Sequence, residues 1–238
     1  MSATYQSFIP EDAEEQVAFA FPNGQKALAG YFVNGVSVGK RSFYEEGILS
    51  VETPLRDGKI HGNCYGWYPS GDLMSIVPYE QGLPHGTATL WAPNGEMLDS
   101  YTMDNGTGIR LDWQYVPNDE GGFIYLHRVD YLQNGFRHGV AWVINPDQRT
   151  IAIENYYYDD IPHGIERVWD DQGRLEPEYP KYYIRGQNLF GEQHEQELSQ
   201  EEYVAVSNGD LTLPPYREEE NDPVRDFPPE VAQHLWRN

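Results

Sequence analysis

The feature that most constrains this chain is a short motif that returns at a nearly constant interval. A glycine turn leads into His-Gly, an aromatic residue follows within a few positions, and a second turn closes the unit. Self-similarity of this kind is typical of arrays in which each repeat buries its apolar face on its neighbours. The motif occurs four times, at intervals of 24, 53 and 25 residues: His61-Gly62, His85-Gly86, His138-Gly139 and His163-Gly164.

Each repeat is expected to form a two-stranded hairpin. In the clearest repeat, the apolar segments 63–68 and 73–79 are separated by Pro69-Ser70-Gly71-Asp72. Proline presets the backbone of such a turn, and glycine accepts the positive φ that closes it. An isolated hairpin is marginal in water, so neighbouring hairpins must share a buried face. Four tryptophans at the aromatic position are expected to form a ladder inside the stack: Trp67, Trp91, Trp142 and Trp169.

The repeats predict a mainly all-β fold, in which stacked antiparallel hairpins form an elongated twisted sheet. About six units of ~24 residues cover 20–176, after an N-terminal segment at 1–19. One early unit has Val38 in place of the histidine. A degenerate unit at 107–134 has its turn at 118–122. The 18 Tyr, 6 Trp and 23 Gly suit short strands and turns.

Residues 177–238 are expected to form a short helical and extended acidic cap and tail. A strand is predicted at 180–184, and Ser199 is a candidate N-cap for a helix. Residues 211–216 are expected to be extended, and 218–229 to be a mobile linker. A final amphipathic turn at 231–236 would then dock Leu235 and Trp236.

The formal net charge of -22 points to a basic partner. Such a charge repels nucleic acid and anionic membrane surfaces and is expected to favour a monomer or a 1:1 complex. The equally weighted alternative is that the acidity serves solubility alone. A single cysteine, Cys64, excludes an intramolecular disulfide. With no signal peptide and no long apolar run in the sequence, the chain is expected to be cytoplasmic.

No pattern in the sequence points to catalysis, a cofactor or a metal, so a non-enzymatic protein is expected. The repeated histidines should lie in a row along the stack, whereas metal ligands must converge on one point. Each imidazole is instead expected to flank a turn and pack on an aromatic ring of the next unit. Cys64 has no basic neighbour to activate it. Nucleophile, phosphate-loop and dinucleotide motifs do not occur.

The Gly-x-x-His-Gly, aromatic-x-x-x-Gly and Tyr-x-x-Gly pattern over roughly 20–176 resembles MORN repeats (membrane occupation and recognition nexus). It is most similar to the variant found in bacterial antitoxin-like and immunity-like proteins. The resemblance implies stacked antiparallel hairpins. It also suggests an immunity protein or antitoxin that neutralises a cognate, basic toxin domain. A non-enzymatic scaffold for protein–protein interaction is the alternative.

An acidic inhibitor would be steered to a basic toxin and could cover its active site. The competing interpretation is that the acidic turns are merely solvated. The candidate partner-binding residues are two acidic pairs at predicted turns and one glutamate between them: Asp159, Asp160, Glu166, Asp170 and Asp171.

Overall fold

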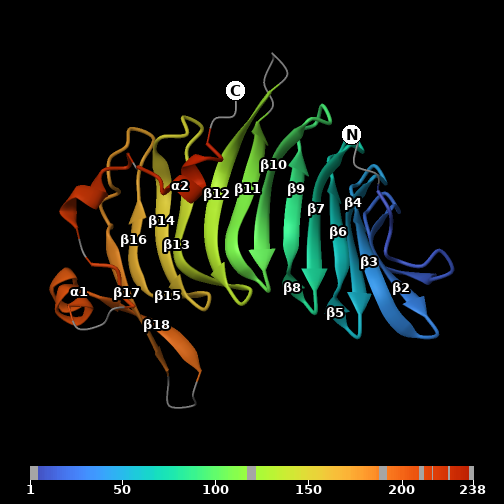
Figure 1. Cartoon of the computed structure of the whole chain (residues 1–238), viewed down its shortest axis with the longest axis horizontal. Coiled ribbons are helices and arrows are strands. Elements are labelled where there is room, and N and C mark those ends of the chain that lie inside the picture. Colours follow the sequence, from blue (N-terminus) through green and yellow to red (C-terminus); the bar gives the residue numbers. More distant parts are fainter. Residues whose placement is uncertain are drawn as a thin grey trace. The chain divides into compact units, whose positions relative to one another are not determined.

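A computed structural model describes residues 5–116, 122–187, 192–208, 212–215, 217–224 and 226–235. The chain divides into two compact units, Met1–Thr107 (unit 1) and Gly108–Asn238 (unit 2). Both consist mainly of antiparallel strands (Figure 1), which confirms the expected all-β architecture of successive hairpins. Within the described ranges, no helix has the length and apolar character needed to cross a membrane.

Each long strand of unit 1 pairs antiparallel with the next long strand along the chain. The two-residue strands β5 and β8 pair with the end of the strand before them. The strands are β1 (Glu14–Ala20), β2 (Lys26–Val33), β3 (Val36–Phe43), β4 (Leu49–Arg56), β5 (Lys59–Ile60), β6 (Gly62–Trp67), β7 (Leu73–Glu80), β8 (Leu83–Pro84), β9 (Gly86–Trp91) and β10 (Met97–Asp104).

Unit 2 follows the same antiparallel order and adds helices. Its strands are β11 (Thr107–Val116), β12 (Phe123–Gln133), β13 (Phe136–Ile144), β14 (Ile151–Tyr158), β15 (Ile161–Pro162), β16 (Gly164–Val168), β17 (Lys181–Gln187) and β18 (Gln193–Leu198). Its helices are α1 (Gln200–Ser207), the 3-10 helix η1 (Glu218–Asn221) and α2 (Pro229–Ala232).

Two kinds of turn alternate along both units. Between hairpins, two successive residues have positive φ, as at Gln81 (50°) and Gly82 (93°). This is the conformation of a two-residue type I′ turn, whose twist matches that of the flanking strands. Within hairpins, the N–H of Tyr68 donates to Asp72 O and that of Gly71 donates to Tyr68 O, both at 2.9 Å. Both turns therefore form where the glycines predict them.

The His-Gly motif marks a break in the strand. The N–H of His85 donates to Pro78 O at 3.0 Å, and that of His163 donates to Tyr156 O at 2.9 Å. The glycine that follows has little room: at Gly164 (φ 143°), an added Cβ would lie 2.6 Å from Cβ of Tyr156. Only glycine fits there, so the repeat spacing reflects a recurring requirement of the backbone.

Residues 5–10, here called the N-terminal strap, lie across one face of the unit 1 sheet. Tyr5 packs edge-on against Tyr65 and Trp67, with ring centroids 5.0 and 5.1 Å apart. Ile9 is 4% exposed and covers Gly39, where an added Cβ would lie 2.5 Å from the isoleucine side chain. The strap therefore supplies apolar cover that a single sheet lacks.

The Glu52 carboxylate is completely buried beneath the N-terminal strap. It accepts hydrogen bonds from Arg41 Nε at 2.8 Å, Tyr5 Oη at 2.6 Å and Ser7 Oγ at 2.9 Å. A buried carboxylate is tolerated only when it is paired and hydrogen-bonded, and these three donors meet that requirement. Two of them come from the strap, so the strap and the buried charge depend on each other.

The described residues 212–215, 217–224 and 226–235, here called the C-terminal strap, lie across one face of the unit 2 sheet. The N–H of Ile151 donates to Pro223 O at 3.0 Å, and Thr150 forms a β-bridge with Val224. Figure 1 shows α2 in front of β12 and β13, and Glu230 Oε1 accepts from Tyr131 Oη at 3.1 Å. These contacts overturn the prediction of a mobile linker at 218–229: its described residues are anchored to the sheet.

A buried ion pair lies beneath the C-terminal strap. Arg167 is completely buried, and its Nη1 donates to Glu154 Oε1 at 2.5 Å. Trp142 Nε1 donates to Glu154 Oε2 at 2.8 Å. Asn221 of the strap accepts from Arg167 Nε at 3.1 Å through its side chain and from Trp169 Nε1 at 2.7 Å through its carbonyl. Sheet and strap therefore share one polar network.

Helix α1 begins where the sequence predicts. Ser199 is its N-cap: its Oγ accepts from Glu202 N–H at 3.3 Å, and the Glu202 carboxylate accepts from Ser199 N–H at 2.8 Å. Such a reciprocal capping box stabilises the first turn. Tyr203 of α1 is completely buried and joins a small apolar core: Ile165, Tyr182 and Leu213.

Strands also occur outside the predicted array of 20–176. At one end, β1 already begins at Glu14. At the other, the predicted strand at 180–184 is β17, and it pairs with β18. The sequence of β18 is almost entirely polar, so it carries no alternating pattern that would have revealed a strand. Most of the predicted turn at 118–122, and Trp236, lie outside the described residues.

The expected tryptophan ladder is not what the ring contacts show. Trp67 stacks with Tyr65 at a centroid distance of 5.9 Å. Trp142 packs edge-on against Tyr131 at 6.1 Å and against Phe227 of the C-terminal strap at 5.5 Å. The tryptophans Trp67, Trp142 and Trp169 are buried, and Trp91 is partly exposed. Trp67 and Trp142 therefore pack on tyrosines of the sheet and on aromatic residues of the straps.

Candidate partner-binding site

The five predicted acidic residues do not form one patch. Asp159 and Asp160 lie in the turn between β14 and β15. Asp170 and Asp171 follow β16, in the turn at its other end, and Glu166 lies within β16. A five-residue strand, β16, separates the two turns, so they lie at opposite ends of that strand. A partner that touched all five residues would have to lie along β16.

The pair Asp159 and Asp160 is already engaged within the chain. Asp160 Oδ1 accepts from Arg137 Nε at 2.8 Å and from the Arg137 N–H at 3.0 Å. Burial raises the pKa of Asp160, but the hydrogen bonds from Arg137 outweigh it and leave the pKa below its usual value. Asp159 lies 3.3 Å from His138 Nδ1 and 3.4 Å from Arg185 Nη1. These ion pairs hold the turn, so its carboxylates are less available for binding a partner.

Asp170 also has a local role. Its Oδ1 accepts from the backbone N–H groups of Gln172 and Arg174, both at 2.9 Å. Those bonds, above all the one from Arg174, lower the pKa of Asp170. Asp171 beside it is exposed. Asp170 thus stabilises the turn through these hydrogen bonds. Of this pair, Asp171 is the residue whose carboxylate is exposed to solvent.

Glu166 lies in a different setting, a small pocket on unit 2. The pocket has a volume of about 120 Å³ and opens between β14, β16 and β18. Here it is called the tyrosine–glutamate pocket. Its lining residues are Asn155, Tyr156, Tyr157, Pro162, Ile165, Glu166, Tyr183 and Glu195.

Within the part of the chain that the structure describes, the carboxylates of this pocket form no ion pair with a cation. Glu166 Oε2 accepts from Tyr183 Oη at 3.2 Å. Burial raises the pKa of Tyr183, and the nearby Glu166 carboxylate raises it further, so this hydroxyl stays protonated as a donor. None of the ion pairs among the described residues involves Glu166 or Glu195. The opposite residue on β17, Lys181, instead places its ammonium over the Tyr179 ring at 5.1 Å.

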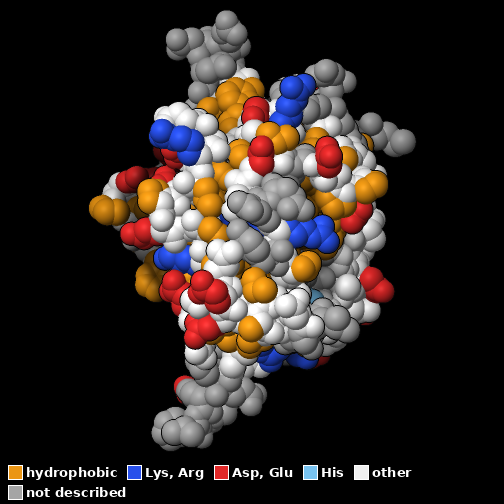
Figure 2. All heavy atoms as spheres, turned by 90° about the vertical axis from the view of Figure 1, so that its left-hand side faces the viewer, with side chains coloured by type: hydrophobic (Ala, Val, Ile, Leu, Met, Phe, Trp, Pro, Cys, Tyr) orange, Lys and Arg blue, Asp and Glu red, His pale blue; other side chains and the backbone are white. Residues whose placement is uncertain are grey.

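This composition suits a cationic side chain. A guanidinium or ammonium group gains from a carboxylate partner and from the face of an aromatic ring. One tyrosine that lines the pocket already makes such a contact within the chain: Arg137 lies 4.0 Å from the Tyr157 ring centre while it pairs with Asp160. Figure 2 shows the end of unit 2 that carries α1, β17 and β18, where acidic side chains are interspersed with apolar ones. A basic side chain from outside the chain would complete the tyrosine–glutamate pocket.

Glu166 could be predicted from the sequence, but the other residues of its pocket could not. Glu195 lies on β18, which was not predicted, and Tyr183 lies in a strand that was predicted without a partner. The polar residues at 193–198 carry no apolar alternation that would reveal a strand, and the pairing of β18 depends on the tertiary structure.

The repeated histidines have separate environments. His85 Nδ1 accepts a backbone N–H at 3.1 Å, and His163 Nδ1 accepts from Arg185 N–H at 2.9 Å. The His138 ring packs on Tyr158 with centroids 4.5 Å apart, but Tyr158 belongs to the same repeat, whereas the prediction placed the ring partner in the next one. Among the residues that the structure describes, no group of three or more His, Cys, Asp or Glu side chains could hold a metal ion.

Cys64 has the environment of an unreactive thiol. It lies in β6, where burial raises its pKa to about 12. The thiolate is the reactive form of cysteine, so a raised pKa suppresses nucleophilic chemistry near neutral pH. This agrees with the sequence, which places no cation beside this residue.

No family model and no curated protein matches this chain.

Proposed function

We propose that this chain is an immunity protein or antitoxin that binds one basic toxin domain and neutralises it without catalysis. The resemblance of its repeats suggests this class, and its charge suits such a partner. The chain has 38 Asp and Glu against 16 Lys and Arg, and nine of these cations form ion pairs among the described residues, so most of the acidic residues have no cation of the chain to neutralise them. A surface of this kind attracts basic partners over a long range.

The single observation that carries the proposal is the tyrosine–glutamate pocket. It supplies a wall of tyrosine rings and two carboxylates that form no ion pair with any described cation of the chain. Tyrosine and arginine are enriched among the residues that dominate binding energy at protein interfaces. In this proposal, one lysine or arginine of the toxin enters the pocket and pairs with Glu166 and Glu195, while the acidic surface accelerates the encounter.

The proposal is tested by recovering the tagged protein from its own cells at low salt and identifying co-purifying proteins by mass spectrometry. One stoichiometric, basic partner that is toxic when expressed alone is the expected result. Association should slow steeply as salt is added, because salt screens the steering field. Several weak partners would favour the scaffold function instead, and an association rate indifferent to salt would remove the argument from charge.

A matched pair of variants separates the contribution of the pocket to binding from the contribution of the overall negative charge. The double variant Glu166→Gln/Glu195→Gln should weaken binding about tenfold or more, because it removes both pocket carboxylates. The control Glu45→Gln/Glu46→Gln removes the same charge from an exposed turn of unit 1. It should change only the association rate, by about twofold. Equal effects of the two variants would show that the pocket contributes nothing specific.

A further inference from the structure

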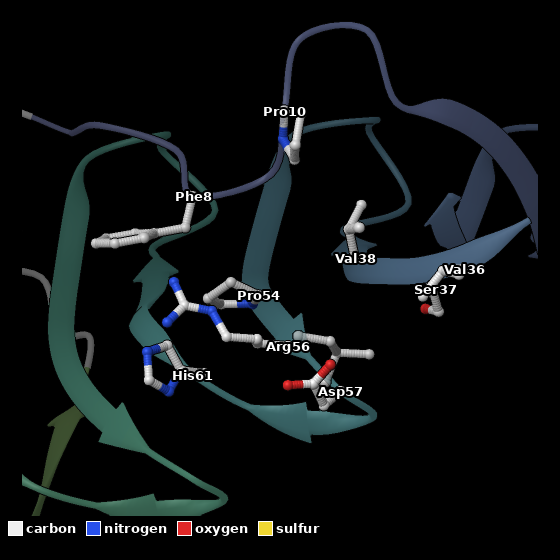
Figure 3. A pocket seen from close by; sticks show the side chains of 10 residues that line it. Phe8, Pro10, Val36, Ser37, Val38, Pro54, Arg56, Asp57 and His61 are labelled. Carbon is white, nitrogen blue, oxygen red and sulfur yellow. The ribbon is translucent and has the colours of Figure 1, made fainter. Parts of the chain in front are cut away.

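A second pocket lies in unit 1, between the N-terminal strap and the sheet (Figure 3). Its volume is about 290 Å³, and it is here called the strap pocket. Phe8 and Pro10 of the strap form one side, and Val38 and Pro54 of the sheet form another. Phe8 is held in place by close packing on Gly62, where an added Cβ would lie 2.8 Å from its ring. The strap thus makes a preformed apolar wall.

Two nitrogen-bearing side chains meet at the floor of this pocket. Figure 3 shows that Arg56 and His61 point toward one another below Phe8. Arg56 is exposed, and within the described residues it takes part in no ion pair. An unpaired guanidinium is notable in a chain whose net charge is -22. Asp57 lines the same pocket, but its carboxylate forms no ion pair with this guanidinium.

His61 differs from the equivalent histidines of later repeats. His85 and His163 each accept a backbone N–H at Nδ1, at 3.1 and 2.9 Å. Such a bond fixes the tautomer of an imidazole. At His61, Nδ1 is buried, and no hydrogen-bond partner is found for it among the described residues. The described part of the chain therefore gives Nδ1 of His61 no hydrogen bond, although the repeat supplies one at His85 and His163.

We infer that the strap pocket binds the C-terminal residue of a peptide chain that ends in an apolar side chain. The carboxylate lies between Arg56 and His61 and accepts hydrogen bonds from both, as carboxylates do in charge-assisted pairs. The apolar side chain packs on Phe8, Pro10 and Val38. The volume of about 290 Å³ accommodates one large side chain with its carboxylate and little more. The preceding residues of the peptide extend into solvent through the open side of the pocket. This inference is independent of the proposed function.

Asp57 allows the direction of a charge effect on carboxylate binding to be tested. It lines the same pocket and opposes a bound carboxylate. It has a positive φ of 52° in a type I′ turn, a conformation that asparagine also tolerates. The substitution Asp57→Asn should therefore keep the turn and strengthen carboxylate binding, whereas Arg56→Gln should weaken it.

The experiment titrates the full chain with three probes and follows backbone amide shifts by NMR. The probes are N-acetyl-glycyl-phenylalanine with a free carboxylate, its C-terminal amide, and 3-phenylpropionate. The free-acid peptide should bind with a Kd of about 1 mM or tighter, and the amide at least about tenfold more weakly. Shifts should concentrate at Val38, Arg56 and His61, and the amide of Glu166 in unit 2 serves as the internal reference.

The variants complete the test. Arg56→Gln should weaken the free-acid peptide at least about fivefold, and Asp57→Asn should tighten it about twofold. Arg149→Gln, which changes an exposed arginine of unit 2, should have no effect. Equal binding of acid and amide, or weaker binding to Asp57→Asn, would overturn the inference. Binding of 3-phenylpropionate as tight as that of the peptide would overturn the peptide assignment and point to a small aryl acid.

Discussion

The two units bury a glutamate at the same place in the repeat but satisfy it differently. Glu52 of β4 and Glu154 of β14 both lie between an arginine on one neighbouring strand and an aromatic residue on the other. In unit 1 the arginine is partly exposed, and two hydroxyls of the N-terminal strap complete the set of donors. In unit 2 the arginine is completely buried and is itself anchored by the C-terminal strap.

The difference shows how a repeat tolerates a buried charge. In unit 1 the sheet supplies the acid and one cation, and the strap supplies the other two donors to Glu52. In unit 2 the sheet also supplies Trp142 as a donor to Glu154, and the strap binds Arg167. Removing one member of a buried pair leaves the other unsolvated, and the penalty grows as the site becomes more enclosed. Unit 2 should therefore be more sensitive than unit 1 to loss of its arginine.

The largest effect is expected for Arg167→Ala. It leaves Glu154 buried beside Trp142 and releases Asn221 of the strap, so the free energy of unfolding of unit 2 should fall by about 3–5 kcal/mol. Urea denaturation followed by tryptophan fluorescence measures this. The control Arg174→Ala removes an arginine whose side chain is 73% exposed and should change stability by less than about 0.5 kcal/mol. Similar losses in both variants would contradict the comparison.

A smaller loss, about 1–3 kcal/mol, is expected for Arg41→Ala. Glu52 keeps its bonds from Tyr5 and Ser7, and water can reach the space that the partly exposed arginine leaves. The same denaturation experiment, monitored by hydrogen exchange of unit 1 amides, provides the measurement. If Arg41→Ala destabilises the protein as much as Arg167→Ala, enclosure by the strap is not what distinguishes the two sites.

Helix α1 belongs to unit 2 alone, and Ser199→Ala tests how much it contributes to covering that sheet. Loss of the capping box should reduce stability by about 0.5–2 kcal/mol. Exchange of the Tyr203 amide should accelerate, because Tyr203 anchors the helix to Ile165 and Tyr182. Ser199→Asp, which retains an N-cap acceptor, should restore most of the loss. Unchanged exchange in Ser199→Ala would mean that packing alone holds the helix.

The smallest effect concerns the inter-hairpin turns, where unit 1 has Gly82 and unit 2 has Asp160. The pKa of Asp160 is lowered in the folded state, so its stabilising contribution is present above the unfolded value, about 3.9, and disappears as the pH falls through the folded value. The side chain is 46% exposed, so this contribution should stay below about 1 kcal/mol. Asp160→Asn should therefore be less stable than the parent at neutral pH, and the two should converge below about pH 3. If the difference in stability between the two proteins stayed constant over this pH range, it would arise from the turn conformation and not from the charge of Asp160.

The repeat motif by itself determined much of this protein. Positive φ at the turn glycines and the narrow space at Gly164 are local requirements, so they appear in the sequence at regular spacing. The capping box of α1 is equally local, which is why Ser199 could be identified from four residues. Such features need no knowledge of distant contacts, and the hairpin architecture follows from them.

The tertiary structure alone decided which residues meet across long separations. Glu52 and Glu154 look like surface acids in the sequence, yet they are buried because Tyr5 and Asn221 belong to straps that return over the sheet. Burial of a charge depends on what covers it, and the cover lies 47 residues from Glu52 in the chain. For the same reason, Asp160 is held by Arg137 instead of facing a partner, while Glu166 keeps an open carboxylate in its tyrosine-lined pocket.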